Sequence, residues 1–286
     1  MKQLFQRIFE RMDSSGMNGF QVATIICAFI SFPILHGCGS ADSAAGKSSA
    51  NSSAIGNDLT ADTSNKVAEP APETAAPPIE PVDPQVEVKA VFQKLLSIRS
   101  EPDPDEWLKA DKQLSAFGKT AIPTLIAEMT SSEPAARELA SMYLAGLGPE
   151  AKDAAAVLEQ ALQDESPFTR VNAASTLTHF PEYRNKATPV LITLASHADP
   201  NTRLTAIYAL GSLDSHSDEQ LNAIKAALND TDGEVQLAAI KVLGQIGVPA
   251  KTTLTEIQSL INDTNTSEVL REAALSSKSL IEQAKQ

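Results

Sequence analysis

A set of recurring arginines contains the side chains best able to bind a ligand in the second half of the chain. They stand at Arg137, Arg170, Arg203 and Arg271, and the first three recur at a constant interval. A planar guanidinium binds carboxylates and phosphates through two parallel hydrogen bonds, so these residues could form an anion site. The same geometry suits a structural role, in which each arginine bonds carboxylates and carbonyls at a turn.

Acidic residues recur with similar regularity and could bind a metal ion. They are Asp164, Asp199, Asp230, Asp232 and Asp263. A calcium loop alternates its acids along one short segment, and none of these positions follows that pattern. Their spacing instead matches the residues that cap helices, where a short polar side chain satisfies a free backbone N–H. We therefore predict helix caps and no metal site.

The remaining groups give no indication of catalysis. The histidines that follow the N-terminal segment, His179, His197 and His216, have no His or Glu three or four residues away on a shared helical face that would complete a metal pair. The two cysteines are Cys27 and Cys38, so the chain beyond Cys38 has no thiol nucleophile. The sequence also contains no glycine-rich phosphate loop. We predict a protein that is not an enzyme, with no cofactor and no evident small-molecule substrate.

The charge of the chain argues against nucleic acid as a partner. The formal net charge is −13 for 286 residues. A surface that acidic repels phosphate backbones, whose attraction to basic proteins supplies most non-specific binding. We expect another protein to be the partner.

Internal repeats reveal the elements that must position these side chains. Leucines at 144, 177, 210 and 243 are evenly spaced, and alanines at 140, 173, 206 and 239 share the same interval. Two further columns comprise Leu125, Leu158, Leu191, Ile224 and Ile257, and Met129, Leu162, Ala195, Leu228 and Ile261. Within a repeat the apolar residues recur at intervals of three and four, which predicts helices with one buried stripe.

Helix starts repeat as well. Glu133, Ser166, Asp199 and Asp232 form one column, followed directly by Pro134, Pro167, Pro200 and Gly233. An N-cap followed by Pro at the first helical position is a helix-start signal. We predict helix-pair units at 104–131, 132–164, 165–198, 199–230 and 231–263, a helix around Val86–Ile98 at one end, and a closing helix at about 267–284. The fold class is all-α, an α–α superhelix in which each unit packs on its neighbours.

These columns resemble HEAT repeats, in particular the short kind named from phycobilisome lyases. The family pattern is an acid, an Arg six residues later, then Ala and Leu three and seven beyond it; Asp164, Arg170, Ala173 and Leu177 match it. The acid is replaced by Ser131 before Arg137 and by His197 before Arg203, and the arginine after Asp230 is replaced by Gln236. The resemblance implies that the arginines form a structural ladder. It is a weak guide to function, because this scaffold hosts many roles.

The resemblance also implies which surface binds a partner. In HEAT folds the arginine-bearing helices line the concave side, and positions two, five and nine beyond each arginine are expected to be exposed there. The candidate binding residues are Leu139, Met142, Asn172, Ser175, His179, Thr205, Tyr208, Lys241 and Gln245. Met142 and Tyr208 suit contact with a protein. They could equally pack against neighbouring helices.

The N-terminal segment predicts export and attachment to a membrane. Residues 1–19 carry three basic residues, and an apolar run follows from Phe20 to Leu35. The sequence Leu35-His36-Gly37-Cys38 resembles the bacterial lipobox, although His36 departs from its usual small residue. That resemblance implies a signal peptide over 1–37 and lipidation of Cys38. A plain secretory signal or an uncleaved anchor are the alternatives.

Between the anchor and the repeats, residues 38–84 are rich in Ser, Ala, Thr and Pro and predict a disordered tether. The repeat domain is predicted to span 85–286. We expect a membrane-tethered, protein-binding scaffold of the bacterial cell envelope, at the outer membrane or periplasm if there are two membranes. The alternative is an enzyme or cofactor-binding subunit similar to HEAT-type lyases or to deoxyhypusine hydroxylase, whose iron-binding His-Glu pairs this sequence lacks.

Overall fold

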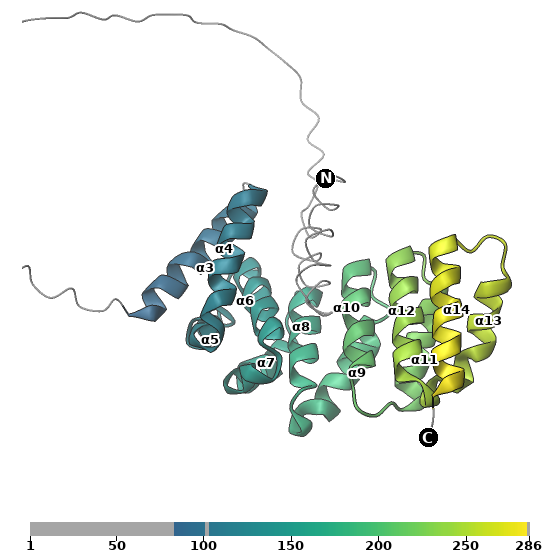
Figure 1. Ribbon diagram of the computed structural model, residues 1–286. Coiled ribbons are helices and arrows are strands. Elements are labelled where there is room, and N and C mark those ends of the chain that lie inside the picture. The colour runs from purple at the N-terminus through teal and green to yellow at the C-terminus, as the bar shows by residue number, and fades with distance from the viewer. Residues whose placement is uncertain (1–82, 101–102, 285–286) are drawn as a thin grey trace, which may run out of the picture. The chain divides into compact units, whose positions relative to one another are not determined.

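The computed structural model describes residues 83–100 and 103–284, and within those ranges the regular structure consists entirely of helices (Figure 1). The predicted signal peptide, Cys38 and almost all of the predicted tether lie outside the described residues. The α-helices are α3 (Pro84–Ser100), α4 (Pro104–Phe117), α5 (Ile122–Glu128), α6 (Pro134–Leu147), α7 (Ala155–Ala161), α8 (Pro167–Leu177), α9 (Arg184–Leu194), α10 (Pro200–Gly211), α11 (Asp218–Ala226), α12 (Gly233–Ile246), α13 (Leu254–Asn262) and α14 (Glu268–Gln283). Short 3₁₀ segments join several of them: η1 (Gly118–Ala121), η2 (Gly148–Ala154), η3 (Pro181–Tyr183), η4 (Ala227–Asn229) and η5 (Val248–Thr253).

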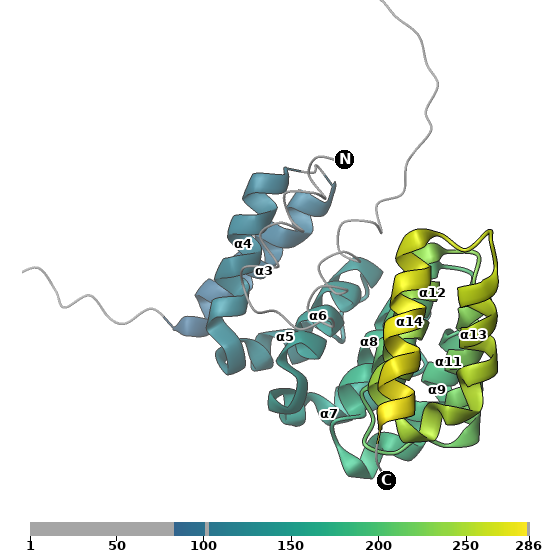
Figure 2. The ribbon, with the colours of Figure 1, turned by 45° about the vertical axis from the view of Figure 1, so that its right-hand side comes forward.

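The predicted helix pairs are confirmed. Each predicted unit contains two helices, from α4 and α5 in the first to α12 and α13 in the fifth, and α3 and α14 are the predicted end helices. The arginine-bearing column lies on α6, α8, α10, α12 and α14, which pack on one another in chain order and which we call the inner row (Figures 1 and 2). The helices α5, α7, α9, α11 and α13 form the outer row. Every described element packs on its neighbours along the chain, so the array is an α-solenoid.

The repeated apolar columns form one continuous core. Leu144, Leu177, Leu210 and Leu243 on the inner row have no solvent exposure, and neither do the four alanines of the second column. The outer-row column from Leu125 to Ile257 is buried as well. Burying one leucine side chain contributes roughly 1.5–3 kcal/mol, so each unit is stabilised mainly through the neighbours that cover it.

Local sequence explains where the inner helices begin. Ser166, Asp199 and Asp232 accept backbone N–H groups of α8, α10 and α12 as predicted, and Pro occupies the first position of α6, α8 and α10. Glu133 occupies the N-cap position of α6 as predicted, but its side chain makes no capping bond. Its side chain is one methylene longer than the favoured caps, and Ser131 Oγ instead accepts the N–H of Glu133 at 3.2 Å.

Two glycines allow close contact between inner helices. Gly211 on α10 and Gly244 on α12 occupy equivalent positions in consecutive units. A methyl group on Gly211 would overlap the side chain of Val242, and one on Gly244 would lie 2.7 Å from Ser277 Oγ on α14. Only a residue without Cβ therefore fits between these neighbouring helices.

The last helix closes the array. Ala274, Ser277 and Ile281 of α14 are buried, whereas Val269, Leu275 and Leu280 are at least half exposed. Lys278, which stands where the repeats have leucine, forms an ion pair of 3.6 Å with Glu282. No helix among the described residues is long and apolar enough to cross a membrane.

Candidate binding surface on the inner row

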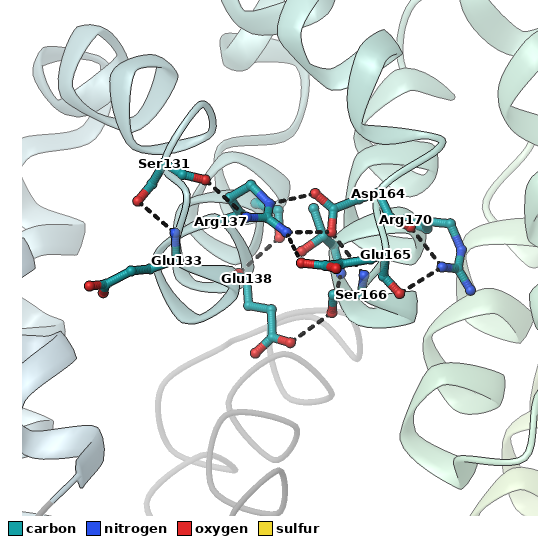
Figure 3. Close-up of polar contacts among 10 residues, drawn as sticks. Ser131, Glu133, Arg137, Glu138, Asp164, Glu165, Ser166 and Arg170 are labelled. Carbon is teal, nitrogen blue, oxygen red and sulfur yellow. Dashed lines mark hydrogen bonds and ion pairs between the residues drawn. The ribbon is translucent and has the colours of Figure 1, made fainter.

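The arginine ladder is best seen at Arg137, at the start of α6 (Figure 3). Its Nε donates to Asp164 Oδ2 at 2.7 Å and its Nη2 to Asp164 Oδ1 at 3.3 Å, which makes the pair bidentate. Nη2 also donates to Glu165 Oε1 at 2.8 Å, and Nη1 donates to the carbonyl oxygen of Ser131 at 2.9 Å. The hydrogen bonds that Arg137 donates to Asp164 and Glu165 raise its pKa.

Arg203 on α10 repeats this arrangement. Its Nε and Nη2 donate to the two carboxylate oxygens of Asp230 at 2.7 and 2.6 Å, and Nη1 donates to the carbonyls of His197 and Ala198. Burial opposes ionisation of Asp230, but the bonds from Arg203, Asp232 and Thr231 and the charge of Arg203 outweigh it and lower its pKa. The side chains of Arg203 and Asp230 are only 11% and 9% exposed, so this pair joins α10 to the turn before α12 largely out of water.

Among the described residues, the other two arginines of the column bond carbonyls only. Arg170 Nη1 donates to the main-chain oxygens of Asp164 and Glu165 at 2.7 and 3.1 Å, and Arg271 Nη2 donates to those of Asp263 and Thr266. The predicted ladder is thus confirmed in full at Arg137 and Arg203, and in its carbonyl half at Arg170 and Arg271.

The acid six residues before each arginine serves a different arginine from the one that the sequence pattern suggests. Asp164 gives only its main-chain oxygen to Arg170, six residues later, while its carboxylate binds Arg137, 27 residues earlier. Asp230 likewise binds Arg203, 27 residues earlier. Replacement of the acid by His197 therefore leaves Arg203 fully bonded and removes the carboxylate partner of Arg170.

The prediction that all the recurring acids cap helices is correct only in part. Asp199 and Asp232 are N-caps. Asp164 and Asp230 are not; they accept the N–H two residues ahead, at 2.8 Å in both cases, while they bind the ladder arginines. Asp263 accepts the N–H of Asn265 at 2.9 Å in the turn after α13. Among residues 83–100 and 103–284, no group of His, Cys, Asp and Glu is arranged to hold a metal ion.

The predicted exposed stripe is mostly buried, and this corrects the sequence analysis. Five of the nine residues are at most 6% exposed: Leu139, Met142, Asn172, Ser175 and Thr205. Leu139 and Met142 belong to the hydrophobic core cluster. Asn172 Nδ2 on α8 donates to Ser141 Oγ on α6 at 3.3 Å, which links adjacent helices of the inner row. The spacing of residues along one helix shows which of them share a face, but not how closely neighbouring helices cover that face. The prediction of exposure was therefore wrong at these five positions.

The remaining four predicted residues reach the surface. His179, Lys241 and Gln245 are exposed, and Tyr208 is half-buried with its ring packed against the core. Burial, followed by the charge of Glu234, raises the pKa of Tyr208. Partial burial and the nearby charge of Arg184 lower the pKa of His179. Whether these residues contact a partner stays a prediction.

A buried polar pair escaped the sequence analysis. Tyr143 Oη on α6 donates to Asp111 Oδ1 on α4 at 2.7 Å. Desolvation by burial raises the pKa of Asp111, and it raises that of Tyr143 well above its usual value. The two residues are separated in the sequence by one residue less than the repeat interval, which places them on consecutive helix pairs. That spacing was the only sequence signal for the contact. The bond fixes the first unit to the second.

Comparison with known proteins supports the fold. The family model described as HEAT repeats matches residues 122–195 and 155–231. No curated protein sequence matches the chain. The matched residues extend from α5 to the turn before α12, so the middle of the α-solenoid is similar to HEAT repeats.

Similar solved structures include designed repeat proteins, engineered proteins and a lyase complex. A designed armadillo repeat protein in complex with the peptide (KR)4 is 18% identical, with a TM-score of 0.49 over 68% of this chain and 99% of its own. An engineered protein is 21% identical, with a TM-score of 0.45 over 68% and 96%. The complex of CpcE and CpcF of phycocyanin lyase from Nostoc sp. PCC7120 is 26% identical, with a TM-score of 0.39 over 56% and 98%.

Proposed function

We propose that this protein is a non-catalytic scaffold that binds another protein through its inner row and is held in the cell envelope by a lipid on Cys38. A solenoid of stacked helices offers a long surface made of consecutive helices, which suits an extended segment or a helix of a partner. The fold is suited to binding because neighbouring units hold this surface in place without a ligand.

Tyr208 carries the proposal. Its ring packs against the core of α10, and its hydroxyl makes no hydrogen bond to any residue within the described ranges. A buried tyrosine normally finds a partner for its hydroxyl, and tyrosines with one apolar and one wet end are enriched at interfaces. Lys241 and Gln245 on the next inner helix add exposed polar groups that can bond a partner's main chain.

The titratable groups with shifted pKa values support a non-catalytic role. The shift at Asp111 accompanies its bond to Tyr143, and those at Arg203 and Asp230 accompany their mutual pair. These are structural cross-links between helices rather than groups converging on one cleft. Metal analysis and an absorption spectrum of the purified protein test this part, and bound iron or a chromophore would contradict it.

A site-specific crosslinking experiment tests the binding surface. A photoreactive amino acid at position 208 in the full chain, expressed in its native envelope, is expected to give a discrete crosslinked product. The control is the same amino acid at Asn222, which is exposed on the outer-row helix α11. Products of equal yield from both positions, or from Asn222 alone, would contradict the proposal.

The energetic test uses Tyr208→Ala on its own. An aromatic anchor at an interface often contributes more than about 2 kcal/mol, so affinity for the crosslinked protein should fall roughly tenfold or more. Met142 lies in the core cluster, and changing it would confuse binding with folding. Tyr208→Phe is the matched control, because it keeps the ring packing and removes only the hydroxyl.

The membrane anchor rests on the sequence Leu35-His36-Gly37-Cys38. Mass spectrometry of the mature N-terminus from the native host should find an acylated cysteine as the first residue. A mature chain that begins elsewhere, or an unmodified cysteine, would leave simple secretion in place of a lipid anchor.

A further inference from the structure

Arg170 has the main-chain contacts of a ladder arginine without the carboxylate. Its Nη1 bonds two carbonyls, as Nη1 of Arg203 does, and Figure 3 shows both dashed lines from Arg170 ending on main-chain oxygens. At Arg137 and Arg203 the opposite edge, Nε and Nη2, donates to an aspartate 27 residues further on. The equivalent residue for Arg170 is His197. In the part of the chain that the structure describes, Nε and Nη2 of Arg170 have no hydrogen-bond acceptor.

His197 maintains its turn but cannot serve Arg170. Its Nδ1 accepts the N–H of Asp199 at 3.1 Å, the bond that Asp164 and Asp230 make at 2.8 Å in their own turns. A neutral imidazole has one acceptor nitrogen, and here the turn uses it, so the proton lies on Nε2. A carboxylate has two oxygens and performs both tasks. The substitution therefore removes the ion pair while preserving the turn.

We propose that the Nε–Nη2 edge of Arg170 is a carboxylate-binding site, occupied by an aspartate or glutamate side chain of the partner protein. Arg170 is half-buried, and two carbonyls hold its Nη1 as two carbonyls hold Nη1 of Arg203, so the same opposite edge is left for bidentate pairing. The source of the carboxylate rests on the protein-binding function proposed above. The preference for a carboxylate rests on the ladder alone.

The charges around Arg170 favour a ligand with one negative charge over a ligand with two. Glu165, whose main chain Arg170 bonds, is 71% exposed, and Asp199 lies in the same turn as His197. The whole chain carries −13. A phosphate dianion is repelled more strongly by these charges than a carboxylate, so selection depends on the two-bond geometry rather than on a basic field.

Nitrogen-15 NMR of the arginine Nε–H groups in the full chain tests the site directly, with sodium acetate as the probe. The Arg170 signal, assigned by its loss in Arg170→Lys, should shift saturably with acetate, while those of Arg137 and Arg203 stay in place. Sodium chloride at equal ionic strength should not reproduce the shift, and sodium phosphate should do so more weakly. Equal movement of all three signals, or the same shift with chloride, would overturn the site.

Two substitutions at position 197 sharpen the test. His197→Asp supplies an internal carboxylate, so the Arg170 signal should already be shifted and should no longer respond to acetate. His197→Asn keeps an acceptor for the turn without a charge, so the acetate response should survive. An acetate response that persists unchanged in His197→Asp would place the binding elsewhere and refute the proposal.

A peptide pair identifies the source of the carboxylate. The blocked peptide acetyl-Gly-Asp-Ser-Gly-amide should shift the Arg170 signal, and its asparagine counterpart should not. A response to acetate without a response to the aspartate peptide would refute the partner side chain and leave a site for small free carboxylates. That outcome is separate from failure of the proposed function, which is read from crosslinking at position 208.

Discussion

The turn before α12 and the turn before α10 differ at the acid position of the repeat, which is Asp230 in one and His197 in the other, and in one ion pair between helices. In the first, Asp230 accepts the N–H of Asp232 and binds Arg203 through both oxygens. In the second, His197 accepts the N–H of Asp199, and Arg170 has no carboxylate partner among the described residues. The acid of the repeat therefore has two separable tasks, to shape its own turn and to neutralise the arginine 27 residues earlier. The comparison predicts that these tasks can be removed and restored independently.

Removing both tasks at once should have the largest effect. Asp230→Ala is expected to lower the free energy of unfolding by about 3 kcal/mol, because it leaves Arg203 unpaired and the N–H of Asp232 without its acceptor. Asp230→His copies the other turn and should cost less, about 2 kcal/mol, since it retains the turn bond. Urea unfolding followed by circular dichroism measures both. Equal costs for the two variants would mean that the tasks are not separable.

The ion pair between Arg203 and Asp230 should also make stability depend on pH. The pKa of Asp230 is lowered on folding, so its contribution is fully present above the unfolded pKa of about 3.9 and is lost as pH falls through the folded value. The stability difference between wild type and Asp230→Asn should therefore shrink in acid. Asp111 should affect the pH dependence of stability in the opposite direction, because burial raises its pKa. Asp111→Asn should become relatively more favourable as pH rises above about 3.9, as judged by thermal unfolding across pH.

Restoring the missing ion pair should have a smaller, positive effect. His197→Asp is expected to raise the free energy of unfolding by about 0.5–1 kcal/mol, because Arg170 is half-buried and partly solvated without its partner. His197→Asn, which supplies the turn acceptor without the charge, should give no such gain. If both variants gain equally, the turn rather than the ion pair limits stability at this position.

The smallest effect is expected at Arg170 itself. Arg170→Gln should cost less than about 1 kcal/mol, since it removes two carbonyl bonds but no ion pair. Arg203→Gln should cost roughly 2 kcal/mol, because it leaves Asp230 buried without its cation. Urea midpoints of the two variants, compared in one buffer, provide the measurement. A larger loss of stability in Arg170→Gln than in Arg203→Gln would contradict the prediction that the carboxylate pair matters more than the carbonyl bonds.

The sequence predicted the fold well because the repeat interval and the core columns are local, redundant signals. The helices that carry Leu144 and Leu158, for example, lie where the spacing of apolar residues predicts them. Caps at Ser166 and Asp199 were equally predictable, since a cap depends on a few consecutive residues. Such features need no knowledge of how distant units meet.

Features that depend on contacts between distant residues were predicted less well. Asn172 is buried because α6 lies beside it, and the carboxylate of Asp164 binds Arg137 rather than Arg170. The sequence pattern pairs the acid with the arginine six residues later, whereas the structure pairs it with the arginine 27 residues earlier. Only the packing of consecutive inner helices decides between those alternatives, and a motif read along a few residues does not contain it.

The close contacts at Gly211 and Gly244 give the two ends of the inner row different tolerances. The positions that correspond to Gly211 one and two units earlier are Thr178 and Ala145, which carry side chains, while Gly211 and Gly244 leave room for Val242 and Ser277 of the next inner helix. A methyl group added at Gly244 has Ser277 as its obstacle and would act as a wedge between α12 and α14. The C-terminal inner helices therefore approach one another as closely as they do only because one side of each contact has no Cβ.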